Sequence, residues 1–349
     1  MKRKLKMKST DSMVIAAIIA LMATAAAAGP ADTVDVRGQV AQGNLTWTPQ
    51  NFPGFYYDLK EGLGTETLTT NLTAGNQLSG DEPYGIIYHT TAQIKDFEFK
   101  DWGSYYVMGF LSKKYFASYI ESDNQSPMAD ESTDKNMLSD GQLLEILLDD
   151  DVDETFTSST PLKLEDGYRL AIRSVDENGK KAFLELTKEG QIVDDTVLSP
   201  SAEGSTISGI TYCYKRDVGD SKDVVVLALH FKDALHGADE DIATVDGQWQ
   251  LSDKPASVKT DDSYGRMNVI DVDADAMKVT MSNKDNAITL SRNKDISLMP
   301  GIGIKTADSD LLRYYIYEPI KVWIINLPGT MAPYEGDSSS FGDDRIIQY

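Results

Sequence analysis

The sequence predicts an all-β protein made of two connected, structurally similar β-sandwiches with one short helix. The main observation is a repeated hairpin pattern: an alternating apolar run, a polar turn and a second alternating run occur at Glu165–Gly190 and again at Tyr264–Asp285. Around this repeat, about fourteen short segments alternate between apolar and polar residues. A single stretch has the spacing of an amphipathic helix.

The two hairpin patterns align when one is shifted by about 97 residues, which places Ile172 on Val269. A one-residue slip in the second strand then places Leu184 and Leu186 near Val279 and Met281. Internal duplication explains this alignment, and chance similarity of two hairpins is the alternative. We therefore expect a first sandwich over residues 159–258 and a second over residues 259–320.

Residues 1–30 have the composition of a secretory signal peptide. The basic start MKRKLKMKST precedes the apolar run Met13–Ala28, and small residues offer a cleavage site before Ala31. The run is short for a membrane span, although an uncleaved anchor is the alternative. No other stretch approaches roughly 18 apolar residues, so we expect a secreted protein with no transmembrane anchor of its own after cleavage.

The chain is strongly acidic, with 33 basic and 55 acidic residues and a formal charge of −22. Without residues 1–30 it has 28 basic and 54 acidic residues, a charge of −26. Such a surface repels nucleic acid and anionic lipids and attracts cations, so we expect no nucleic-acid partner. Cys213 is the only cysteine, which excludes an internal disulfide.

Residues 31–158 are predicted to be an N-terminal β region. Which sandwich its strands join is open, and completing the second is the preferred expectation. Thr65–Thr73 has the polar, β-branched composition of an exposed strand. An aromatic stretch before it is either a hydrophobic lid on a core or an exposed binding platform. The platform would use Trp47, Phe55, Tyr56 and Tyr57.

The one expected helix begins at Ser139, where a capping-box spacing precedes an apolar stripe, and ends at about Asp149. The stripe consists of Leu143, Leu144, Leu147 and Leu148. Further along, Asp223–Phe231 is so apolar that we expect a strand covered on both faces. Residues 321–349 are expected to be a polar C-terminal tail.

Acidic residues supply the candidates for metal binding. Asp271–Asp275 opens like an EF-hand loop, but Ala276 stands where glycine is needed and Ser282 where the bidentate glutamate is needed. The run Asp149–Glu154 could bind calcium loosely, and a solvated acidic segment is the alternative. The weak calcium candidates are Asp149, Asp151, Asp271 and Asp273, and no other cofactor is expected.

No catalytic residues emerge from the sequence. The three histidines, His89, His230 and His236, do not have the spacing of a metal site. Cys213 lies in an expected strand with no histidine near it in the sequence. We therefore expect no enzymatic activity, with a secreted hydrolase as the alternative. Three sequons make Asn44, Asn71 and Asn124 candidates for N-glycosylation, in keeping with export.

Several long blocks resemble the S-layer duplication domain of surface-layer proteins from archaea of the Methanosarcina type. The resemblance covers about residues 33–320, and its blocks include GFYYDLKEGLGTETL, DFEFKDWGSYYVMGFLSKKYFASY, GYRLAIRSVDENGKKAFLELTKEGQIVDD, TYCYKRDVGDSKDVVVLALHF, ADEDIATVDGQWQLSD and TLSRNKDISLMPGIGIKTADSDLLRYYIYEPI.

The resemblance implies a module of two connected, similar β-sandwiches that assembles into a porous, acidic lattice around the cell. The expected function is that of a structural S-layer protein whose lattice acts as a protective charged sieve. The expected partners are other copies or other S-layer subunits, with calcium at lattice contacts as a further option. The alternative is a secreted β-sandwich module that binds a glycan or a cell-surface partner without forming a lattice.

Overall fold

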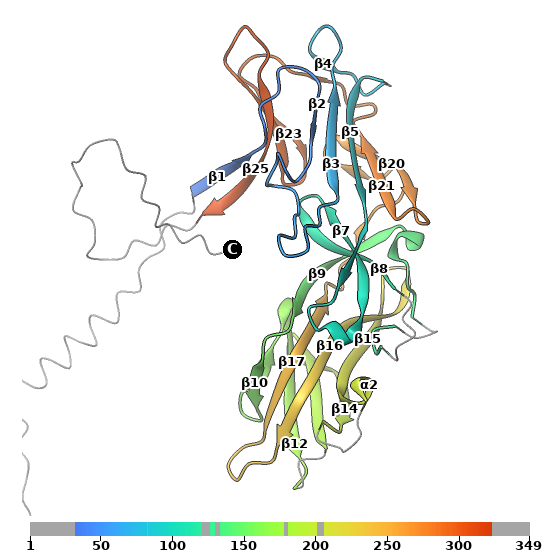
Figure 1. Cartoon of the computed structure of the whole chain (residues 1–349), viewed down its shortest axis with the longest axis vertical. Coiled ribbons are helices and arrows are strands. Elements are labelled where there is room, and N and C mark those ends of the chain that lie inside the picture. Colours follow the sequence, from blue (N-terminus) through green and yellow to red (C-terminus); the bar gives the residue numbers. More distant parts are fainter. Residues whose placement is uncertain are drawn as a thin grey trace, which may run out of the picture. The chain divides into compact units, whose positions relative to one another are not determined.

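Two β-sandwiches make up the fold, and the expected all-β class is confirmed (Figure 1). The computed structural model describes residues 32–81, 83–120, 126–129, 133–177, 181–200 and 206–322. Residues 36–318 form one compact unit. Among the described residues, no helix is long and apolar enough to cross a membrane.

The second sandwich pairs a six-stranded sheet with a four-stranded sheet. The six-stranded sheet has the order β19 (Ser263–Tyr264), β20 (Met267–Asp273), β21 (Lys278–Ser282), β5 (Gly85–Thr91), β3 (Glu66–Asn71) and β2 (Leu45–Trp47). The four-stranded sheet has the order β1 (Asp32–Arg37), β25 (Tyr314–Val322), β24 (Ile302–Thr306) and β23 (Asp295–Met299). A small ribbon joins β22 (Ile288–Thr289) to β4 (Gln77–Leu78). Strands β2, β3 and β5 from the N-terminal part of the chain thus share this core with β25.

The first sandwich packs a four-stranded sheet against part of a nine-stranded sheet. The smaller sheet has the order β11 (Leu162–Lys163), β12 (Tyr168–Val175), β13 (Ala182–Lys188) and β14 (Gln191–Leu198). The larger has the order β15 (Thr211–Val218), β16 (Ser221–Leu235), β17 (Ile242–Leu251), β9 (Gln142–Asp150), β8 (Lys113–Tyr119), β7 (Ser104–Phe110) and β6 (Gln93–Asp96). In addition, β10 (Glu154–Thr157) pairs with β17, and β18 (Ala256–Ser257) pairs with β9.

Strand β16 is buried on both faces over Val224–Phe231, as its apolar sequence predicts. Leu227 and Leu229 join the core of the first sandwich. Val226 and Ala228 point the other way, into a separate cluster around Trp249 and the strands β7–β9. Because successive side chains of a strand face opposite sides, a strand can be apolar throughout only where both sides are covered.

The predicted helix at residues 139–149 is wrong, because Gln142–Asp150 forms strand β9. A short 3-10 helix, η2 (Met137–Asp140), precedes it and is capped by the side chain of Asn136. Gln142, Leu143 and Leu144 are all buried, so this leucine-rich run is covered on both faces and periodicity alone cannot distinguish it from a helix. The remaining helices of the described chain are α2 (Ile207–Ile210), η1 (Lys100–Trp102) and η3 (Glu165–Gly167).

The repeated hairpins are β12–β13 and β20–β21, and their ladders match without the expected slip. Ile172 pairs with Leu184 in the first, and Val269 with Met281 in the second, so both strands keep the separation of 97 residues. Each ladder also shifts register at the same place, next to Arg173 and Ile270. A β-bulge conserved in position between two hairpins of one chain supports duplication over chance similarity.

The hairpin β7–β8 connects the two halves of the compact unit (Figure 1). One of its faces contributes Tyr105, Val107 and Phe116 to the cluster around Trp249. The opposite face contributes Met108 and Phe110 to the core of the second sandwich. This alternation follows from the two-residue period of a strand, and it places one hairpin in two cores at once.

A buried glutamate fixes the tip of this hairpin on the second sandwich. Glu66 of β3 is completely buried and accepts hydrogen bonds from the Tyr56 amide, the Ser112 amide and the Tyr88 hydroxyl at 2.8–2.9 Å. The Tyr88 hydroxyl also accepts from the Leu111 amide at 3.2 Å. The carboxylate therefore pairs donors from three segments that would otherwise be buried without acceptors.

Leu111 and Ser112 form the turn between β7 and β8, and both have positive φ values of 52° and 68°. This is the conformation of a two-residue hairpin turn, which normally carries glycine or asparagine because a side chain is strained there. Since both amides are bonded to Glu66 and Tyr88, the buried acceptors hold the turn in this conformation.

The expectation that residues 65–73 form an exposed strand is wrong on one face. Four of their side chains are buried, namely Thr65, Glu66, Leu68 and Thr70. Besides Glu66, Thr65 contacts the hairpin, because its hydroxyl accepts from the Gly109 amide at 2.7 Å. The prediction failed because a polar side chain that hydrogen-bonds a neighbouring hairpin cannot be distinguished, from the sequence alone, from one that is exposed to solvent.

Glu66 should make stability depend on pH. Burial raises its pKa from 4.5 to about 7, so between these values the folded protein binds a proton that the unfolded chain has released. The free energy of unfolding should therefore fall as the pH rises from about 4.5 to about 7, by up to about 3 kcal/mol from this group. Urea unfolding at several pH values should show a weaker pH dependence for Glu66→Gln than for the wild type.

Two variants complete this test. Burial also raises the pKa of Glu318 to about 7, so Glu318→Gln should reduce the slope in the same window. Glu154 is exposed on β10, so Glu154→Gln should keep the wild-type profile. A wild-type slope in Glu66→Gln would contradict the assignment to Glu66.

Candidate functional site

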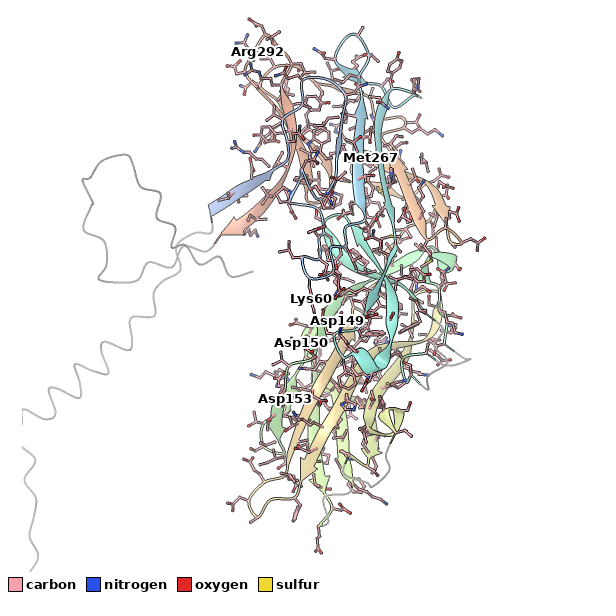
Figure 2. All side chains as sticks on the ribbon, viewed as in Figure 1. Lys60, Asp149, Asp150, Asp153, Met267 and Arg292 are labelled. Atoms are coloured by element: carbon pink, nitrogen blue, oxygen red, sulfur yellow. The ribbon has the colours of Figure 1, made fainter. Side chains whose placement is uncertain are left out.

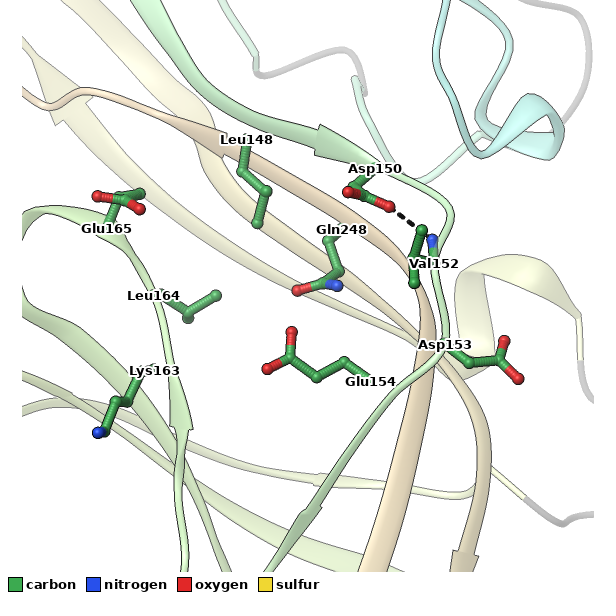
Figure 3. Close-up of a pocket in the computed structure, with 9 residues that line it drawn as sticks. All are labelled: Leu148, Asp150, Val152, Asp153, Glu154, Lys163, Leu164, Glu165 and Gln248. Carbon is green, nitrogen blue, oxygen red and sulfur yellow. Dashed lines mark hydrogen bonds between the residues drawn. The ribbon is translucent and has the colours of Figure 1, made fainter. Parts of the chain in front are cut away.

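An acidic pocket of about 300 Å³ lies where β9 ends and β10 begins (Figure 3). Its lining residues are Leu148, Asp150, Val152, Asp153, Glu154, Lys163, Leu164, Glu165 and Gln248. Four of them are carboxylates and one is a lysine. The pocket forms because the chain turns out of the nine-stranded sheet after β9, re-enters beside β17 as β10, and then crosses to the opposite sheet at β11.

Two of the pocket's four carboxylates have partners within the protein. Asp150 accepts from the Val152 amide at 2.6 Å, and Asp153 is paired with Lys232 at 2.6 Å. In the described part of the chain, no three potential ligands lie close enough to hold one metal ion. The pocket can attract hydrated cations by its charge, but it has no preformed coordination site.

The calcium candidates lie on different strands and are not brought into one site. Asp149 is almost fully buried, with 2% of its side chain exposed. It accepts from the Glu98 amide at 2.9 Å and the Tyr105 hydroxyl at 2.8 Å, and Lys114 lies 3.2 Å away. Asp149 therefore has a structural role, whereas Asp150 and Asp153 follow it toward the pocket (Figure 2).

The other three candidates are exposed. Asp151 lies in the segment between β9 and β10. Asp271 and Asp273 lie on β20, and Asp273 accepts from the Ala276 amide at 2.8 Å, so it caps the turn of the repeated hairpin. Calcium binding by these residues stays a prediction.

The cysteine and two of the histidines considered as catalytic candidates have structural surroundings. Burial raises the pKa of the Cys213 thiol to about 12, which opposes formation of the reactive thiolate. His230 bonds Asp246, and His236 bonds Asp241 at 2.7 Å. These carboxylates orient histidines that contact no hydroxyl or thiol among the described hydrogen bonds.

The exposed aromatic platform is wrong. Trp47 and Phe55 are 0% and 2% exposed, and Phe55 stacks edge-on against Phe52 and Tyr88 in the core of the second sandwich. The Trp47 indole donates to the Gln39 carbonyl at 2.9 Å. Tyr56 is half-buried and Tyr57 is 38% exposed, so the stretch is a lid on the core.

Two of the three sequons come together on the surface. The register of β2 on β3 pairs Leu45 with Thr70, so Asn44 lies opposite Asn71. Sequence reasoning missed this, because 27 residues separate the two asparagines and only strand register brings them together. Asn124 lies outside the described residues.

Comparison with known proteins identifies the family. Residues 37–308 match a family model described as S-layer protein, which covers the first sandwich, the hairpin β7–β8 and the second sandwich up to β24. The chain belongs to the S-layer protein family. The resemblance seen in the sequence is thereby confirmed.

Curated S-layer relatives match over most of this chain. The Major S-layer protein of Methanosarcina mazei is 31% identical over 294 residues, which is 81% of this chain and 40% of the relative. The Major S-layer protein of Methanosarcina acetivorans is 30% identical over 362 residues, 97% of this chain and 50% of the relative. The chain therefore spans at most about half the length of these relatives.

Asp149→Ala should destabilise the protein much more than a change at a neighbouring acid. It would leave the Glu98 amide, the Tyr105 hydroxyl and Lys114 without their acceptor, at a cost of about 2–4 kcal/mol in the free energy of unfolding. Asp151→Asn removes one exposed carboxylate and should change it by less than about 0.5 kcal/mol. Chemical denaturation measures both, and equal effects would contradict the structural role of Asp149.

Proposed function

We propose that this chain is a structural subunit of an S-layer on the surface of an archaeal cell and has no catalytic activity. The observation that carries this proposal is the family match, which extends over residues 37–308 and so includes the first sandwich and most of the second. The relatives that cover 81–97% of the chain are named Major S-layer proteins. Export to the surface would follow from the signal-like residues 1–30.

The charge of the chain suggests what such a layer does. A formal charge of −22 per chain gives a lattice many fixed carboxylates, and those around narrow openings would slow anions and let small cations pass. The acidic pocket between β9 and β10 adds to this field without binding one ion tightly. The layer would therefore act as a charged sieve and a protective coat.

A non-enzymatic role is supported by how the reactive residues are used. The thiol of Cys213 is held protonated by burial, and both His230 and His236 bond carboxylates. The aromatic stretch that a glycan-binding module would use is mostly within the core, which disfavours that alternative.

Assembly should depend on screening of the acidic surface. Copies with a net charge of −22, or −26 without residues 1–30, repel strongly at low ionic strength, where the Debye length is about 30 Å at 0.01 M salt, and less at 0.5 M. We expect the purified protein to form sheets or symmetric oligomers at about 0.5 M NaCl, or with millimolar calcium, and not at 0.01 M NaCl. Negative-stain electron microscopy and sedimentation report the assembled state.

Two further measurements separate the parts of this proposal. Assembly that needs calcium at matched ionic strength and reverses on adding a chelator would support calcium at lattice contacts; assembly in NaCl alone would remove calcium and keep the lattice. Surface biotinylation of intact cells should label this chain. A monomer under every condition, together with no surface labelling, would overturn the structural role.

A further inference from the structure

Asn71 presents its side chain on the outer face of the six-stranded sheet. It ends β3, where Leu68 and Thr70 point into the core, so the intervening Thr69 and then Asn71 point outward. Its partner on β5 is Gly85, which has no side chain to cover it. The amide of Asn71 is therefore accessible from outside the sandwich.

Asn44 lies on the same face, directly opposite Asn71. The outward-facing hydroxyls of Thr46 and Thr69 contact each other at 2.8 Å one step along the ladder. The side-chain Oδ1 of Asn44 accepts from the Leu72 amide at 2.8 Å, within the sequon that begins at Asn71. Side chains opposite each other in an antiparallel pair have Cβ atoms about 5 Å apart, so the two sequons form one surface site.

A pocket of about 580 Å³ opens beside Asn71 and does not include Asn44. Its apolar walls include Tyr84, Ile87 and Ile270, the last being the residue at the duplicated β-bulge. Tyr84 is 46% exposed, although it is a large aromatic side chain. The polar wall includes Asp81, Ser282 and Lys284, which offer a carboxylate, a hydroxyl and an ammonium group.

These features match the chemistry of a pyranose ring. One face of such a ring carries C–H groups and can pack on an aromatic side chain, which removes apolar surface from water. Its edge carries hydroxyls that donate to a carboxylate or accept from an ammonium group. A sugar joined to the amide of Asn71 would start at the edge of this pocket.

We propose that Asn71 carries an N-linked glycan whose first pyranose lies in this pocket against Tyr84. In the attachment step a separate transferase uses a glycosyl phosphate donor. The Asn71 Nδ2 forms a bond to the anomeric carbon, the bond from that carbon to the phosphate oxygen breaks, and the phosphate leaves with the electron pair. Nδ2 loses one proton to a base. This inference rests on the export that the proposed function requires.

The pocket gives the glycan a role in the folded protein. The wall residues come from the loop before β5, from β20 and β21, and from the end of β3. A sugar seated there would contact segments that are about 200 residues apart in the chain and would stabilise their packing. Asn44 does not line this pocket, so a glycan on Asn44 would start outside it.

The test compares the protein purified from an N-glycosylating archaeal host with the same chain from a host that lacks N-glycosylation. Glycopeptide mass spectrometry should find a sugar on Asn71. In the glycosylated protein, Asn71→Gln and Tyr84→Ala should each lower the melting temperature by about 1–3 °C, and the double variant should lower it no further than either one. In the unglycosylated protein this coupling should disappear.

Asn44→Gln is the matched control, because it removes the opposite sequon on the same face and should show no coupling to Tyr84→Ala. An unmodified Asn71, or additive effects of Asn71→Gln and Tyr84→Ala in the glycosylated protein, would overturn the inference. If the protein forms sheets although Asn71 is unmodified, the glycan inference is wrong and the proposed lattice role stands. If Asn71 is modified and coupled to Tyr84 but the protein forms no sheets, the glycan inference stands and the lattice role is wrong.

Discussion

The carboxylate of Glu66 is the interaction on which the connection between the two halves of the protein depends. It is buried and accepts from three segments, and one of these donors is at the tip of the hairpin β7–β8. An isolated charge is costly to bury, and the hydrogen bonds from the Tyr56 amide, the Ser112 amide and the Tyr88 hydroxyl offset that cost. The strained turn at Leu111 and Ser112 persists for the same reason.

The rest of the architecture is a variation on a duplicated plan. Each sandwich has one hairpin with a bulge at the same place, next to Arg173 or Ile270, and an opposing three-stranded meander whose last strand takes a partner from earlier in the chain. The copies differ in what they added. The second sandwich recruits β2, β3 and β5, and the sheet of the first continues into β6–β9. The bulge at Ile270 then became a wall of the pocket beside Asn71.

Much of this could be predicted from the sequence, and the failures have common physical causes. Strand alternation identified both hairpins and the doubly covered β16, because these patterns are local. It failed for β9, where pairing on both edges overrides a leucine pattern that also suits a helix. Burial of Glu66 and the pairing of Asn44 with Asn71 depend on contacts between residues that are distant in the sequence. Local sequence patterns cannot predict such contacts.

The hairpin shared by two cores also bears on how such proteins can diversify. Tandem domains are usually exchanged by recombination because each one folds with its own closed core. Here a crossover that kept one sandwich alone would leave β7–β8 with a bare apolar face, on the side of either Phe110 or Phe116. Recombination breakpoints between the two halves would therefore be selected against. The pair of sandwiches is therefore inherited as one unit, even though the two share a duplicated plan.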